Sequence, residues 1–128
     1  MKTLQILVRA LTLTLAVVAA PAVFAHGDDK AKYGGVIAEV KDVNYELVAK
    51  ADTVVLYVED HGKKVDTNGA TAKLTLLTDG QKTEVMLMPA GDGKLETKGA
   101  FSSKAGTKAI ALVTLAGKPP ASVRFEIK

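Results

Sequence analysis

The sequence predicts an all-β domain, an immunoglobulin-like antiparallel β-sandwich of seven to eight strands. The first observation is a period-two alternation of apolar and polar side chains in residues 54–59, 73–76 and 123–127. Such alternation places one set of side chains in a core and the other in water, as in half-buried strands. The second is that clusters rich in Gly, Asp and Pro separate the short apolar runs, as turns separate strands. Seven or eight short strands within about 100 residues are typical of this sandwich.

The expected strands follow one another closely along the chain, and three turn-forming clusters fall between them. The strands cover residues 36–40, 43–49, 54–59, 73–76, 82–88, 95–101, 108–115 and 123–127, and the turns cover residues 78–81, 91–93 and 116–120.

The first two of these runs have an alternative interpretation. Val36, Val40, Val43 and Leu47 also match the apolar stripe of a helix spanning residues 35–50. A glycine pair before this stretch and the Lys-Asp break within it favour two strands. Both interpretations remain open at this point.

Residues 1–25 have the form of a cleaved secretory signal peptide: two cations, a short apolar stretch and a small residue, Ala25, at the cut. Cleavage there leaves a flexible polar tail, residues 26–32, and one β-sandwich domain, residues 33–128. The mature chain is expected in the periplasm, with no membrane span left after cleavage.

Composition excludes several classes of function. The signal peptide holds two of the 17 basic residues and none of the 14 acidic ones, so the mature chain carries a formal net charge of only +1. This balance does not favour nucleic acid as a partner. Cysteine is absent, which excludes thiolate metal sites and thiol catalysis. No serine lies in a nucleophile-elbow setting, and no phosphate-binding loop precedes a helix, so we expect no enzyme.

The histidines are the first candidate ligands. Cleavage after Ala25 makes His26 the mature N-terminus, where its α-amine and imidazole together suit Cu(II), which favours nitrogen donors. His61 follows a strand and Asp60 precedes it, so this carboxylate supplies an oxygen or orients the ring. The alternatives are that His26 follows the cleavage site by chance and that His61 is a turn residue with nothing bound.

Met86 and Met88 are the second candidate. In residues 82–88 they share one face with Lys82 and Glu84, which predicts that both thioethers point to solvent. Thioethers are soft donors that suit Cu(I). The alternative is that both methionines fill gaps in a covered core.

Strand direction predicts how these candidates are arranged. If the strands alternate up and down, His61 and the methionine pair share one end of the sandwich, and the tail leaves from the other end. The seven tail residues span roughly 23 Å when extended, about the length of one strand. We therefore expect two separate weak half-sites, or a site shared between molecules, rather than one pocket.

Several short stretches carry a resemblance to known proteins: Tyr33-Gly34-Gly35, Tyr45-Glu46-Leu47-Val48, Leu56-Tyr57-Val58, Asp60-His61-Gly62, Gly69-Ala70-Thr71-Ala72-Lys73-Leu74, Ala90-Gly91-Asp92, Leu115-Ala116-Gly117-Lys118 and Val123-Arg124-Phe125. The pattern resembles small periplasmic β-sandwich proteins associated with heavy-metal efflux systems, including the N-terminal domains of cation-efflux adaptor proteins.

A weaker similarity is to copper-resistance proteins of the CopC type. That similarity implies Cu(II) held by an N-terminal histidine, a second histidine and a carboxylate, which would correspond to His26, His61 and Asp60. It also implies a Cu(I) contact at Met86 and Met88, although the two methionines are fewer than that family's Met-rich segment. In this chain Asp60 and His61 are adjacent and lie far earlier than that family's pair.

The expected function is therefore non-enzymatic binding of copper, or of another divalent transition metal, in periplasmic metal tolerance, with an efflux component as the partner. The rival hypothesis is a metal-independent interaction module that docks on an envelope or efflux protein through a sheet edge or the methionine face.

Overall fold

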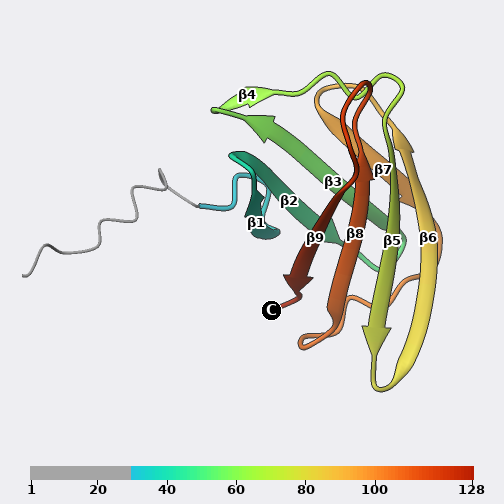
Figure 1. The fold of residues 1–128 in the computed structure, drawn as a ribbon. Coiled ribbons are helices and arrows are strands. Elements are labelled where there is room, and N and C mark those ends of the chain that lie inside the picture. The colour runs from blue at the N-terminus through green and yellow to red at the C-terminus, as the bar shows by residue number, and fades with distance from the viewer. Residues whose placement is uncertain (1–29) are drawn as a thin grey trace, which may run out of the picture.

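The structure is a computed structural model and describes residues 30–128. The fold is all-β, as the alternation predicts (Figure 1). Its strands are β1 (Val36–Val40), β2 (Val43–Ala49), β3 (Thr53–Asp60), β4 (Lys63–Lys64), β5 (Thr71–Thr78), β6 (Gln81–Pro89), β7 (Lys94–Lys98), β8 (Lys108–Thr114) and β9 (Ala121–Glu126). The count exceeds the expected seven to eight because β4, a pair of lysines, carries no apolar pattern that the sequence could reveal.

All nine strands belong to one antiparallel sheet that is nearly closed into a barrel. The strand order is β1-β2-β3-β7-β6-β5-β8-β9, and β4 pairs with β3 outside this path. Strand β6 pairs with β5 along most of its length and with β7 at Met88 and Pro89, so it joins the two halves of the sheet. At the opposite side β9 packs against β1, although the two strands form no ladder (Figure 1).

The stretch that also fits a helix forms two strands. Val36 pairs with Leu47 and Val40 pairs with Val43, so the residues of the apparent helical stripe are cross-strand neighbours. Lys41 and Asp42 connect the strands, with φ values of 50° and 65°. Two successive residues with positive φ form a tight hairpin turn whose twist matches that of the strands, which resolves the alternative in favour of a β-hairpin.

The core is built by the alternating residues of both halves of the sheet. Leu56 on β3, Leu74 on β5 and Leu87 on β6 are completely buried. Burial of one such side chain contributes roughly 1.5–3 kcal/mol, and a chain without cysteine depends on these contacts for its stability. The ladder then fixes which side chains face outward, and the candidate functional residues within residues 30–128 lie on or beside that outer surface.

Candidate functional site

His61 lies in a hairpin turn between β3 and β4. Asp60 pairs with Lys63 across the hairpin, and His61 and Gly62 form its two-residue loop, with φ values of 49° and 78°. Histidine is among the few residues other than glycine that adopt such values readily. The His61 side chain is 79% exposed, so its ring is open to a ligand from solvent.

Asp60 orients this ring. Its Oδ1 lies 2.5 Å from Nδ1 of His61, and the contact leaves Nε2 of the ring without a partner among the described residues. A carboxylate on one ring nitrogen fixes the tautomer and orientation in which the other nitrogen binds a metal. The charge of Asp60 also affects Tyr45 on β2. Burial of Tyr45 raises its pKa, and the charge of Asp60 raises it further.

These two side chains do not complete a metal site by themselves. Within residues 30–128, no three side chains of His, Asp or Glu gather closely enough to hold a metal ion. The remaining histidine candidate, His26, lies outside the described residues. A Cu(II) site at His61 therefore needs donors beyond this pair.

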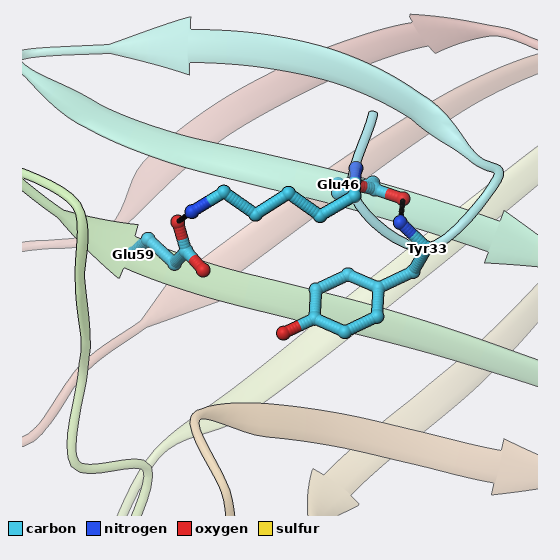
Figure 2. Close-up of polar contacts among 4 residues, drawn as sticks. Tyr33, Glu46 and Glu59 are labelled. Atoms are coloured by element: carbon cyan, nitrogen blue, oxygen red, sulfur yellow. Dashed lines mark hydrogen bonds and ion pairs between the residues drawn. The ribbon is translucent and has the colours of Figure 1, made fainter. Parts of the chain in front are cut away.

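The start of the described chain is held by a buried carboxylate. Glu46 on β2 is 6% exposed and accepts hydrogen bonds from the backbone N–H groups of three residues: Lys32 at 2.6 Å, Tyr33 at 2.8 Å and Gly35 at 3.0 Å. Figure 2 shows the hydrogen bond that joins Glu46 to the backbone of Tyr33. The Tyr33 ring stacks on Tyr57 of β3, with the centroids 3.7 Å apart. Residues 32–35, the N-terminal segment, therefore cover the outer face of β2 and β3.

Lys32 extends this contact toward His61. Its Nζ lies 2.6 Å from Oε2 of Glu59, the residue before Asp60 (Figure 2). The hydrogen bond to Glu59, together with its charge, raises the pKa of Lys32. For the described residues of the tail, the expectation that it leaves from the end opposite His61 is wrong, because Glu46 folds the N-terminal segment back across β2 and β3 and Lys32 lies beside Glu59.

Met86 and Met88 point outward, as their place on β6 predicts. Their exposed fractions are 49% and 54%, which excludes the interpretation that they fill gaps in the core. Met88 pairs with Glu96 of β7, and Glu96 pairs with Val55 of β3. His61 lies six residues beyond Val55, about 20 Å along the strand. The expectation that the methionines and His61 share one end is therefore wrong: β6 meets β7 only at its last residues, level with the start of β3.

Two further features escaped the sequence analysis. Glu46 follows the period-two pattern as an outward residue, and only its apolar neighbours Tyr45 and Leu47 hint that its surroundings are covered. Ile110 and Leu112 on β8 are exposed, and the signal for them is the unbroken apolar run of residues 109–113, which leaves both faces of β8 apolar.

Comparison with known proteins adds no relative: the searches return no matching family model, no matching curated protein and no matching solved structure. None of the elements formed by residues 30–128 is a helix with the length and hydropathy needed to cross a membrane.

Proposed function

We propose that the mature protein is a non-enzymatic, periplasmic copper-binding protein. Its Cu(II) ligands come from the mature N-terminus, His26, and from the β3–β4 turn at His61. Nε2 of His61 supplies one donor, and the Asp60 carboxylate orients the ring through Nδ1. The α-amine and imidazole of His26, free after cleavage behind Ala25, supply two more. Nitrogen-rich tetragonal coordination of this kind suits Cu(II) better than the other divalent metals, which remain the alternative cargo.

The observation that carries this proposal is the ion pair between Lys32 and Glu59. It ties the start of the described chain to the residue that precedes the Asp60–His61 pair. His26 is six residues from Lys32, and six extended residues span about 20 Å. One molecule therefore has enough chain to bring both histidines to one ion, so the proposal replaces the separate half-sites with a single site.

Met86 and Met88 form a second, separate contact in this proposal. Two exposed thioethers, spaced two residues apart on one face of β6, suit Cu(I) rather than Cu(II). Their distance from His61 means that they take no part in the Cu(II) site. An efflux component of the envelope is the partner to which such a protein would pass the metal.

We also propose that the strands follow the order of an immunoglobulin-like sandwich. Strands β2-β3-β7 follow the order of strands A, B and E of an immunoglobulin-like sandwich, and β6-β5-β8-β9 follow C′, C, F and G. In this description β6 is the strand that passes between the sheets, and β1 is an added edge strand. The resemblance to efflux-associated periplasmic sandwich proteins supports this interpretation.

Titration of the mature protein, beginning at His26, with Cu(II) tests the proposal. His61→Asn removes the imidazole but keeps a residue that tolerates positive φ, so the turn is retained. An added glycine before His26 removes the amine from the histidine. We expect each change to weaken Cu(II) binding at least about tenfold, whereas Asp79→Asn in the equivalent β5–β6 turn has no effect. Unchanged affinity in both altered proteins would exclude these ligands.

The second candidate function is a metal-independent interaction module. A specific observation favours it: of the six large hydrophobic residues that are exposed within residues 30–128, all but Tyr33 lie on the outer face of β5, β6 and β8. Exposed apolar side chains gathered on one face are typical of surfaces that contact other proteins. Binding of a partner that is unaffected by chelators and lost on substitution of Met86 and Met88 by serine would support this function.

A further inference from the structure

One outer face of the sheet carries both apolar and charged side chains in a regular pattern. The outer face of β6, β5, β8 and β9, called here the outer sheet face, is bare in the described structure (Figure 1). Its exposed hydrophobic residues are Leu77, Met86, Met88, Ile110 and Leu112. Alternating with them are the charged residues Lys73, Lys82, Glu84, Lys108, Arg124 and Glu126, all of them exposed.

The strand register arranges these side chains in rows across the sheet. One row runs from Glu84 on β6 through Thr75 and Ile110 to Arg124 on β9. The next row runs in the same direction: Lys82, Leu77, Lys108 and Glu126. Each row therefore carries opposite charges on β6 and β9. Thr75 and Ile110 lie between them in the first row, and Leu77 and Lys108 lie between them in the second.

In the first row the two end charges do not neutralise each other. Glu84 and Arg124 are three strands apart, about 14 Å, too far for a direct contact. Glu84 bonds to Lys82 and Lys73 on its own side of the face, and these lysines lower its pKa, so it is a carboxylate at neutral pH. Arg124 forms no ion pair with any described residue.

We propose that the outer sheet face is the interface of a two-fold symmetric homodimer. A two-fold axis parallel to the strands, between β5 and β8, lays β6 of one subunit over β9 of the other and keeps each row opposite itself. Glu84 then faces Arg124 of the partner subunit, and Lys82 faces Glu126 of the partner subunit. Symmetry repeats each pair, so the face is complementary to itself in charge.

The apolar residues agree with this axis. Ile110 and Leu112 lie on β8, next to the axis, so those of the two subunits pack together with the aliphatic stem of Lys73. An axis across the strands, between these two rows, would also pair opposite charges, because it lays Glu84 over Lys82 and Arg124 over Glu126. It would, however, place Met86 and Leu112 opposite the ends of the partner's strands and leave them uncovered. Burial of the apolar residues therefore selects the axis parallel to the strands.

The size of the face sets the strength of the dimer. Four strands of about seven residues cover roughly 450 Å² per subunit, against about 800 Å² per partner in a stable complex of standard size. The dimer therefore belongs to the weak class and forms only at high protein concentration. This inference deepens the second candidate function by naming the occupant of the face, and it is independent of the Cu(II) site.

Analytical ultracentrifugation of the mature protein in EDTA, over a concentration series, tests the inference. Arg124→Glu breaks no ion pair within the described residues and places two carboxylates opposite each other across the interface. We expect it to weaken the dimer at least about tenfold. Glu84→Arg acts in the same direction from the other side of the pair. The double variant Glu84→Arg/Arg124→Glu restores the opposite charges, and we expect it to dimerise within about threefold of the wild type.

A control variant and three outcomes that would overturn the inference complete this test. Lys118→Glu changes the charge equally in an exposed loop outside the face, and it leaves the dimer unchanged. Thermal unfolding confirms that each variant is folded. A wild type that stays monomeric at millimolar concentration overturns the inference, and so does a dimer that the double variant fails to restore. A monomer that captures another protein through this face also overturns it, because the occupant is then a different chain. None of these outcomes changes the expected Cu(II) titration.

Discussion

The two outer faces of the sheet differ in how they meet solvent. Over β2 and β3, the N-terminal segment covers the face, and Glu46 satisfies three backbone N–H groups that would otherwise lose their partners. Over β6, β5, β8 and β9, no described segment covers the face, and its apolar side chains stay exposed. The covered face has its partner within the chain, whereas the bare face is the one that we assign to a partner outside it.

The difference also separates the two proposed functions. The covered face directs the start of the chain to His61 and so belongs to the copper proposal. The bare face carries the dimer proposal and, at both methionines, the proposed Cu(I) contact. Substitutions on the bare face should therefore leave Cu(II) binding unchanged, and substitutions on the covered face should leave the dimer unchanged.

The largest expected effect on the free energy of unfolding is the difference between a core substitution on β5 and an outer-face substitution on β8. Leu74→Ala, in the core, should lower the free energy of unfolding by about 2–5 kcal/mol, because it leaves a cavity. Leu112→Ala, on the outer sheet face, should lower it by no more than about 0.5 kcal/mol in the monomer. Urea unfolding at low protein concentration measures both. Equal losses would mean that the outer sheet face is covered within the monomer.

The next effect tests the covered face. Glu46→Ala should lower the free energy of unfolding by about 3 kcal/mol, because it removes the charged acceptor of three part-buried backbone N–H groups of the N-terminal segment. Glu96→Ala, an outward carboxylate on β7, serves as the control with an expected change of about 0.5 kcal/mol or less. If the two variants unfold at the same urea concentration, Glu46 does not hold the segment.

A somewhat smaller effect concerns the close approach of the N-terminal segment to β2. A Cβ atom at Gly35 would lie 2.2 Å from the backbone oxygen of Leu47, so Gly35→Ala must displace the segment. We expect a loss of about 1–3 kcal/mol by the same urea assay. Gly80→Asn, at an open turn position whose positive φ asparagine tolerates, should cost less. The reverse ranking would contradict this packing.

The smallest effect is a pH dependence on the outer sheet face. Hydrogen bonds from Lys82 and Lys73, together with their charges, hold the pKa of Glu84 below its ordinary value of 4.5. The folded protein therefore binds this proton less tightly than the unfolded chain, so the stabilisation is present above that value and is lost as the pH falls through the lower folded pKa. The difference in urea midpoint between wild type and Glu84→Gln should be small at pH 7 and should shrink as the pH falls through the lowered pKa of Glu84. A difference that grows in acid would contradict it.

The sequence predicts local features of this protein better than distant ones. The alternation of Leu56 and Val58 with Tyr57 predicts β3, and the outward direction of Met86 and Met88 follows from the same period. These patterns depend on neighbouring residues. The separation of Met88 from His61 depends instead on the short pairing of β6 with β7, a register between distant strands that no local pattern encodes.

The candidate site shows the same limit. The strand-end position of His61 and its neighbour Asp60 are visible in the sequence, and the contact between them is local. The role of Glu46 is not visible, because its partners lie 11 to 14 residues away on a segment without a periodic pattern. This one carboxylate turns the N-terminal segment back across β2 and β3.

The most direct test of the account is the line broadening that substoichiometric Cu(II) causes in the amide NMR spectrum of the mature protein. We predict that the resonances of the N-terminal residues and of residues 60–62 broaden together at the same copper concentration, independently of protein concentration. Resonances of Met86 and Met88 should remain sharp. Broadening confined to the N-terminal residues, with His61 unaffected, would contradict the single site.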